Sequence, residues 1–243
     1  MSLEIKNITI RTDNKEVVHD VSMTLESGTI SVLMGPNGSG KSTFANGIFG
    51  HPKYEIAGGT MVLDSEDVVG LATEKKAQKG LFLSMQYLPE IGGVTLTSFL
   101  HKSYVTLKGS DISIIDFYTL LEQKANELSI DSSFLSRQVN VGLSGGEKKL
   151  SEILQLAVLE PKFAVLDEID SGVDVDSLRK VFSAISKLAE KGTGFLLVTH
   201  YNALLDHITP QFVHVMKDGR LVKSGGKELV EDIVKNGFTA FVQ

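Results

Sequence analysis

The stretch from Gly35 to Thr43, GPNGSGKST, constrains this chain more than any other, because it fits the phosphate-loop pattern G-x-x-x-x-G-K-[ST]. An apolar segment, residues 30–34, precedes it and predicts a buried strand, while residues 42–49 predict a helix. Its three glycines let the backbone turn tightly, because no Cβ stands in the way. The loop amides and the positive end of the helix dipole then face one anion. The sequence therefore predicts a strand–loop–helix unit that binds phosphate groups.

Each residue of this loop is a predicted contact of a bound nucleotide. Lys41 is expected to reach the outer phosphates, and the Ser42 hydroxyl is expected to bind Mg²⁺. An ordinary glycine-rich turn is the alternative, which the later motifs make less favourable. The expected phosphate-binding residues are Gly35, Pro36, Asn37, Gly38, Ser39, Gly40, Lys41, Ser42 and Thr43.

Two adjacent carboxylates follow a second apolar segment, residues 163–166, which predicts a buried strand. Asp167 suits a Mg²⁺ ligand, direct or through water, because hard cations prefer carboxylate oxygen. Glu168 suits a general base that polarises an attacking water. Two acids at the solvated end of a strand are the alternative, but a phosphate loop elsewhere in the chain favours the metal site.

A second anion site is predicted where Ser144, Gly145 and Gly146 begin a helix. Ser144 and Glu147 fit the capping-box pattern S-x-x-E, and apolar residues recur at helical spacing up to Pro161. The two anion sites could fold onto one nucleotide. Alternatively, each could lie opposite its counterpart in another copy of the chain.

Charge and composition exclude several classes of protein. The net charge of −6, without a basic cluster, argues against a nucleic-acid partner. No apolar run approaches the length of a membrane span, and residues 1–4 do not begin a signal peptide, so no direct membrane insertion is expected. The absence of cysteine rules out disulfides and thiolate ligation by this chain, so a cytoplasmic location is expected.

The remaining patterns predict an α/β fold: a nucleotide-binding core preceded by antiparallel strands and interrupted by a helical insert. We expect a single domain, residues 1–243, with the core in residues 1–86 and 157–243 and the insert in residues 87–156. An irregularity is expected near Asn7 in the first strand, and a loop is expected over residues 51–60. Further expected elements are strands at 60–64, 80–84 and 195–198, helices at 96–105, 113–128 and 177–191, and a hairpin around Asp218-Gly219. In the helix at 113–128, the residues expected to share the buried face are Ile114, Tyr118, Leu121, Ala125 and Leu128.

Over nearly its whole length the chain resembles the ABC ATPase family. The matching motifs are Walker A at Gly35–Thr43, the Q-loop at Gln86, the signature at Leu143–Glu147, Walker B at Phe163–Glu168, the D-loop at Ile169–Asp174 and the switch histidine at His200. The resemblance implies Mg²⁺-dependent ATP hydrolysis by an ATP-dependent homodimer, in which each ATP lies between the phosphate loop of one copy and the signature of the other. It implies that Glu168, His200 and Gln86 are catalytic, and that Ser42, Gln86 and Asp167 hold Mg²⁺. One departure concerns recognition of the adenine base. Many members place an aromatic residue near position 12 to stack on adenine, whereas this chain has Thr12, with Val17 and Val18 nearby.

A closer resemblance is to one subfamily, the SufC-type ATPases of SUF iron–sulfur cluster assembly. It rests on segments that mostly lie outside the shared motifs: His51–Glu55, Gln86-Tyr87, Glu90–Val94, Ser144–Lys149, Glu152–Gln155, Asp167–Gly172, Thr199–Tyr201 and Val213–Val215. It implies SufB/SufD-like scaffold proteins as partners. The chain departs from the subfamily pattern at Leu88-Pro89, Gly92 and Leu150.

Asp170 adds a third carboxylate two residues after Glu168, and Lys148 and Lys149 lie on the signature helix. We hypothesise a latch in which one of these lysines pairs with Glu168 or Asp170 in the resting monomer; a plain surface ion pair is the alternative. Three functions remain open. They are an ATPase that drives a cytosolic scaffold, the ATPase subunit of a membrane transporter, and a nucleotide-gated binding module, against which the presence of Glu168 and His200 argues.

Overall fold

A computed structural model of the protein describes residues 1–169, 173–199 and 207–238. Its centre is a six-stranded sheet in the order β12-β11-β3-β10-β9-β6. Five strands run parallel, and β12 is antiparallel to its neighbour β11. The strands are β3 (Ile30–Met34), β6 (Leu81–Ser84), β9 (Phe163–Asp167), β10 (Gly194–Val198), β11 (Phe212–Lys217) and β12 (Arg220–Gly225). Every residue of β3, β9 and β10 is buried, as expected for parallel strands that are covered on both faces.

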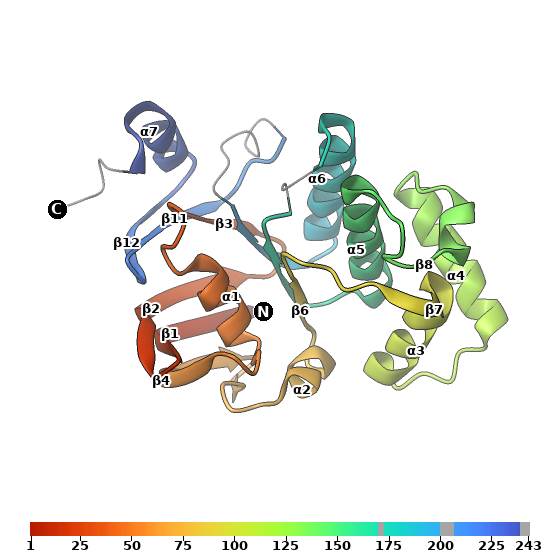
Figure 1. The fold of residues 1–243 in the computed structure, drawn as a ribbon, viewed down its shortest axis with the longest axis horizontal. Helices are drawn as coiled ribbons and strands as arrows, with labels where there is room; N and C mark the ends of the chain where they lie inside the picture. The colour runs from red at the N-terminus through yellow and green to blue at the C-terminus, as the bar shows by residue number, and fades with distance from the viewer. Residues whose placement is uncertain (170–172, 200–206, 239–243) are drawn as a thin grey trace.

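The two faces of this sheet form two separate cores (Figure 1). On one face, α1 (Lys41–Ile48) and an antiparallel sheet pack against alternate residues such as Leu33 and Leu196. On the other face, α5 (Gly145–Leu159), α6 (Val175–Glu190) and α7 (Glu228–Asn236) pack against Val32 and Leu197. The core strands therefore end between a layer of helices and a layer formed by α1 and the antiparallel sheet, which fixes where their last residues lie.

The antiparallel sheet has the order β2-β1-β4-β5. Its strands are β1 (Ser2–Thr12), β2 (Lys15–Glu26), β4 (Glu55–Leu63) and β5 (Glu66–Asp67). The irregularity predicted near Asn7 is confirmed, because its φ is 50° and the β1–β2 register shifts between Ile5 and Ile8. The loop expected over residues 51–60 is wrong in its second half. There β4 already begins at Glu55, because pairing with Arg11 and the residues before it supplies backbone hydrogen bonds that local sequence does not reveal.

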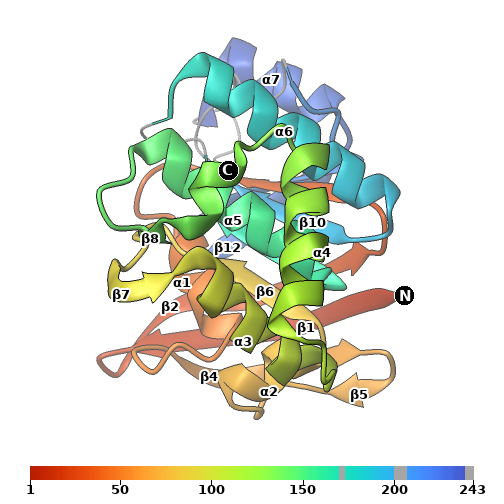
Figure 2. The ribbon, with the colours of Figure 1, turned by 90° about the vertical axis from the view of Figure 1, so that its right-hand side faces the viewer.

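Residues between β6 and α5 form a group of helices at one end of the molecule (Figure 1). They are α3 (Leu96–Lys108), α4 (Ile114–Glu127) and the 3₁₀ helix η1 (Ser132–Ser136), with a small sheet of β7 (Ile91–Thr95) and β8 (Gln138–Val139). The helices predicted at 96–105 and 113–128 are therefore confirmed. Figure 2 shows α4 on the outside of this group, with α5 behind it. A third core cluster joins α3 and α4 to Leu154 and Val158 of α5.

The buried face predicted for α4 is partly wrong. Leu121 and Ala125 are buried as expected, but Ile114 is 48% exposed and Tyr118 is 39% exposed. The stripe that packs inward is instead centred on Phe117, whose ring lies tilted against those of His101 and Tyr104 of α3. The helical spacing of the apolar residues was predicted correctly, but the side of the helix that faces inward was not, because apolar residues occur on both sides of this helix.

The remaining elements match their predictions with small shifts. α6 begins at Val175, two residues before the predicted start, because the Asp174 side chain caps it by accepting from Ser177 N–H. The hairpin around Asp218-Gly219 is confirmed as β11 and β12. A short helix, α2 (Thr73–Gln78), was not predicted. Within the residues described, no helix has the length and apolar character that crossing a bilayer requires.

Candidate nucleotide-binding site

The phosphate loop connects β3 to α1 and forms the floor of a cavity of about 580 Å³. Gly40, with φ 102°, precedes the first residue of α1 and offers no side-chain cap, so the first-turn N–H groups have no acceptor within the helix. The rest of the lining comes from β2 and from the ends of β6 and β9. The lining residues are Val17, Asn37, Gly38, Ser39, Gly40, Lys41, Ser42, Thr43, Gln86 and Glu168.

Lys41 is buried, and its ammonium is held by the loop itself. Nζ donates to the carbonyl oxygens of Gly35 at 2.8 Å and Pro36 at 3.0 Å. Burial lowers the pKa of this amine, while the nearby Glu168 and Asp167 carboxylates act in the opposite direction. A buried cation beside the loop suits a phosphate group, and the expected contact of Lys41 with the outer phosphates stays a prediction.

Asp167 and Ser42 meet at the carboxyl end of β9. The Ser42 hydroxyl donates to Asp167 Oδ1 at 3.2 Å, and Asp167 is fully buried. Its other oxygen, Oδ2, is buried without a hydrogen-bond partner among the described residues. Burial raises the pKa of Asp167, which the Ser42 hydrogen bond partly offsets. A carboxylate oxygen that lacks a donor, beside a hydroxyl, fits a hard divalent cation such as Mg²⁺.

Glu168 follows in a left-handed backbone conformation, with φ 50°, and its N–H donates to Val198 O at 2.9 Å. This turn directs its side chain to the cavity rather than to the core. Gln86 Nε2 donates a hydrogen bond to the Glu168 carboxylate. The structure therefore brings together two of the three expected catalytic residues, although Gln86 contacts Glu168 and not Asp167; His200, the third, lies outside the described residues.

The helix start predicted as a second anion site carries the expected capping box and lies apart from the phosphate-loop cavity. Ser144 Oγ accepts from Glu147 N–H at 3.3 Å and the Glu147 carboxylate accepts from Ser144 N–H at 2.8 Å, so the capping box is confirmed. Arg137 also pairs with the Glu147 carboxylate, whose pKa these contacts keep below its usual range. Ser144 and Gly145 are exposed, and neither lines the phosphate-loop cavity. Within one copy of the chain, the signature does not meet the phosphate loop.

The two signature-helix lysines pair with carboxylates other than those of the hypothesised latch. Lys148 lies 3.1 Å from Glu90, and Lys149 lies 3.0 Å from Glu152 in a pair that is almost entirely buried. Asp170 lies outside the described residues. Sequence reasoning missed the Lys149–Glu152 pair, whose signal was two opposite charges three residues apart on one helix.

Val17 of strand β2 lines the cavity. Gly146 packs closely on α6, since a Cβ there would lie 2.7 Å from Ser177 Oγ. This close approach fixes the signature against the start of α6, next to Asp174 of the predicted D-loop.

Comparisons with known proteins agree with this geometry. The family described as "ABC transporter" matches residues 18–171. The chain is 42% identical over 240 residues to a probable ATP-dependent transporter, ycf16, of Cyanophora paradoxa, covering 97% of this chain and 93% of that one. It is 44% identical over 239 residues to Vegetative protein 296 of Bacillus subtilis, covering 98% and 92%.

Solved structures share the fold at lower identity. An ATP-binding subunit of an ABC transporter aligns over all of both chains with a TM-score of 0.83 at 20% identity. A dimeric bacterial ABC transporter cassette aligns over 92% of this chain and 98% of its own, with a TM-score of 0.80 at 19% identity. These likenesses confirm the predicted fold class, an α/β P-loop core with an antiparallel sheet and a helical part.

Proposed function

The chain belongs to the ABC transporter family and is an ATPase, and we propose that it is the ATP-hydrolysing subunit of a cytosolic iron–sulfur cluster assembly scaffold of SufC type. In this proposal, ATP-driven dimerisation changes the conformation of SufB/SufD-like partner subunits. The observation that carries the ATPase chemistry is a single cavity lined by the phosphate loop, Gln86 and Glu168.

The proposed roles follow from the contacts. Residues Gly35 to Thr43 hold the phosphates through loop amides, the Lys41 ammonium and the helix dipole. Glu168 accepts a proton from the attacking water, and Gln86 orients its carboxylate through their hydrogen bond. His200 is proposed to contact the γ-phosphate. We also retain the division into a core, residues 1–86 and 157–243, and an insert, residues 87–156.

Mg²⁺ is the proposed metal, and Ser42, Asp167 and Gln86 would hold it. The partnerless buried oxygen of Asp167 beside the Ser42 hydroxyl supports the first two ligands. When bound, the ion neutralises charge that develops on the phosphate oxygens.

A homodimer is proposed because the signature lies outside the phosphate-loop cavity of its own copy. Ser144, Gly145 and Gly146 would close over the ATP of the other copy, with the first turn of α5 facing its phosphates. One of the solved structures that share this fold is a dimeric cassette, which supports the proposal of a dimer.

The assignment to cluster assembly rests on the segments shared with the SufC-type subfamily outside the nucleotide motifs. The absence of cysteine agrees with a subunit that supplies motion while others hold the cluster. The names of the relatives favour a second candidate, the ATP-binding subunit of a membrane transporter. The two candidates share the ATP site and differ in the partner.

The two candidates can be distinguished through the proposed partner surface near Gln86. Tyr87 is 83% exposed, and beside it a cavity of about 160 Å³ is lined by mainly apolar residues that include Phe82, Met85 and Leu88. Exposed apolar groups around a hollow are typical of interaction sites. We expect a purification of the full chain to capture soluble scaffold proteins, identified by mass spectrometry.

Tyr87→Ala is expected to reduce this capture about tenfold or more, as for a central aromatic contact, with ATP affinity unchanged. Tyr118→Ala, on the outer helix α4, is the matched control and should capture as the wild type does. Capture of a multi-span membrane protein in place of soluble scaffolds would overturn the assembly proposal and support the transporter. If Tyr87→Ala captured as much scaffold protein as the Tyr118→Ala control, the proposed role of Tyr87 in partner binding would be refuted.

A further inference from the structure

The tip of the β11–β12 hairpin lies between the phosphate loop and strand β2. Gly219 N–H donates to Ser39 O in the phosphate loop at 2.9 Å. On the other side, His19 N–H in β2 donates to Gly219 O at 2.8 Å. One turn residue therefore joins the phosphate loop to the antiparallel sheet through its own two backbone groups.

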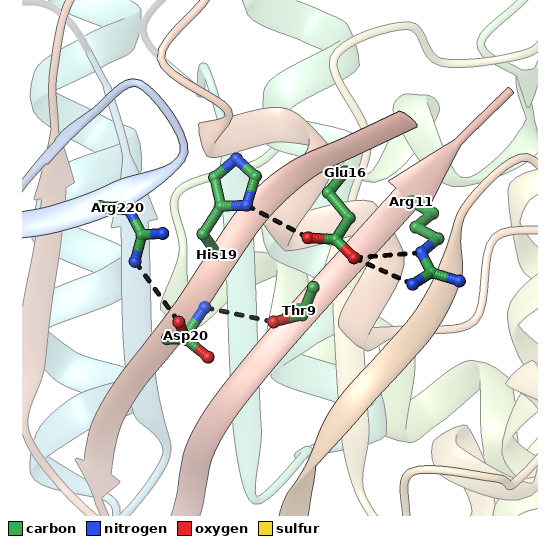
Figure 3. Close-up of polar contacts among 6 residues, drawn as sticks. All are labelled: Thr9, Arg11, Glu16, His19, Asp20 and Arg220. Carbon is green, nitrogen blue, oxygen red and sulfur yellow. Dashed lines mark hydrogen bonds and ion pairs between the residues drawn. The ribbon is translucent and has the colours of Figure 1, made fainter. Parts of the chain in front are cut away.

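The side chains beside the tip reinforce this connection (Figure 3). Arg220, the first residue of β12, pairs with Asp20 of β2 at 3.4 Å. Asp20 N–H in turn donates to Thr9 Oγ1 of β1 at 3.3 Å. Asp20 has a φ of 51° in a strand whose register shifts at this level, so β2 bulges where it meets the hairpin.

Only glycine fits at this position. Gly219 has a φ of 76° after Asp218 at 46°, which are the left-handed angles of a tight hairpin turn. A Cβ on Gly219 would lie 2.1 Å from Val17 O and 2.8 Å from the His19 ring. The chain therefore could not carry a side chain here without moving β2 or the hairpin.

The strand that leads to this tip also contacts the loop. β11 pairs with β3, whose last residue precedes the loop, and a Cβ on Gly35 would lie 2.1 Å from Met216 O. The Met216 methyl group lies 3.2 Å from the Cβ position of Gly40. The loop is thus held at its beginning by β11 and near its end by the hairpin tip.

We propose that the β11–β12 hairpin is a strap that holds the phosphate loop in its nucleotide-binding conformation, and that Gly219 is its positioning residue. Gly219 acts through Ser39 and is not among the residues that line the cavity. The strap also connects the phosphate loop to strand β2, whose residue Val17 lines the cavity. It therefore fixes the distance between the loop and β2 across the cavity. This role belongs to ATP binding itself and does not depend on which partner the chain serves.

The test is Gly219→Ala in the full-length chain, compared with Gly109→Ala. Gly109 has a similar φ of 62° but no atom within 4 Å of its Cβ position, so it carries the same backbone strain without the close approach. Hydrogen exchange without nucleotide would follow the amides of residue 219, Ser39 and Phe44, which all donate hydrogen bonds at the loop. Calorimetric titration would give the Kd for ATP, and steady-state kinetics would give KM and kcat.

For Gly219→Ala we expect exchange at these amides and the Kd for ATP each to rise about tenfold, with kcat at saturating ATP within about twofold. For Gly109→Ala we expect wild-type exchange and affinity. A variant that is less stable but keeps wild-type loop exchange and KM would show a merely structural glycine and overturn the proposal.

Arg220→Ala gives a second measurement if Gly219→Ala does not fold. It removes the contact to Asp20 and leaves the turn intact, so loop exchange should rise about twofold to threefold with the overall fold retained. Loop exchange identical to the wild type in this variant would also count against the strap.

Discussion

Asp167 and Glu168 are neighbours in sequence, but their surroundings are different. Asp167 is fully buried at the end of β9, with one oxygen bonded to Ser42 and the other without a partner among the described residues. Glu168 turns out of the strand through a left-handed φ and contacts Gln86 at the cavity. One carboxylate is therefore placed to hold a cation and the other to accept a proton. Burial of the Asp167 charge has an energetic cost, which its raised pKa expresses.

Asp167→Asn is therefore expected to make the chain more stable and less able to bind Mg-ATP. The amide keeps an acceptor for Ser42 and removes a buried charge, so the free energy of unfolding should rise by about 1 kcal/mol, or about 2–4 °C in Tm. The further rise in Tm that Mg-ATP gives the wild type should be lost. Thermal unfolding with and without Mg-ATP measures both effects. Asp111→Asn, an exposed control, should change neither, and an Asp167→Asn chain that is less stable without nucleotide would contradict the argument.

At the scale of the element, helix α2 is fixed to the phosphate-loop helix by one buried amine. Lys76 of α2 is 1% exposed, and its Nζ donates to Ile48 O at the carboxyl end of α1 at 2.9 Å. A cation is favourable near a helix carboxyl end, but burial opposes the charge. Burial lowers the pKa of Lys76 from its ordinary value of 10.5 to about 8, against the effect of Asp67.

This lowered pKa predicts a pH dependence of stability. Between about pH 8 and 10.5 the unfolded chain binds more protons at Lys76 than the folded chain, so the free energy of unfolding rises with pH. The rise should approach about 3 kcal/mol, and Lys76→Met should lack it. Urea denaturation from pH 7 to 10.5 gives the comparison. Lys75→Met, on the exposed side of the same helix, should keep the wild-type slope, and parallel curves for wild type and Lys76→Met would refute the prediction.

Elements with a strong local signal were predictable from the sequence, and those that depend on distant pairing were not. The capping box at Ser144 and the turn at Asp218-Gly219 specify their own backbone, and both are confirmed. β4 was missed before residue 60 because its partner, β1, is more than forty residues away along the chain. The buried face of α4 was predicted partly wrongly, because Phe117 lies on that face through its packing against α3, which the sequence of α4 alone does not show.

At the scale of the whole molecule, the sequence predicted two anion sites but left open whether they meet. The answer depends on how α1 and α5 pack on opposite faces of the central sheet, which no local pattern contains. The phosphate-loop cavity has no lining residue from Ser144 to Gly146. The contact between the hairpin tip and the phosphate loop also depends on packing that no local pattern contains, since it joins Ser39 to the distant Gly219. Tertiary structure therefore decides both how the phosphate loop is held and which segments line its cavity.

Two complementary variants test whether a second copy completes the site. Lys41→Ala removes the ammonium at the phosphate loop and leaves the signature intact. Gly145→Asp places a negative charge at the exposed signature, where it opposes a triphosphate but is favourable for the first turn of its own helix. Neither variant alone should release phosphate from ATP. An equal mixture should recover about a quarter of the wild-type rate, because half of the dimers are mixed and each holds one intact site.

In the control mixture, a chain that carries both substitutions replaces one of the two single variants. This mixture should stay inactive, because no dimer in it pairs a native phosphate loop with a native signature. Gly145→Asp alone should still bind ATP at its own phosphate loop, since Gly145 does not line that cavity. Retained binding with lost hydrolysis is what distinguishes a site shared between copies from one built within a single chain. Wild-type hydrolysis by Gly145→Asp alone would contradict the shared site, and so would a complementary mixture as inactive as its components.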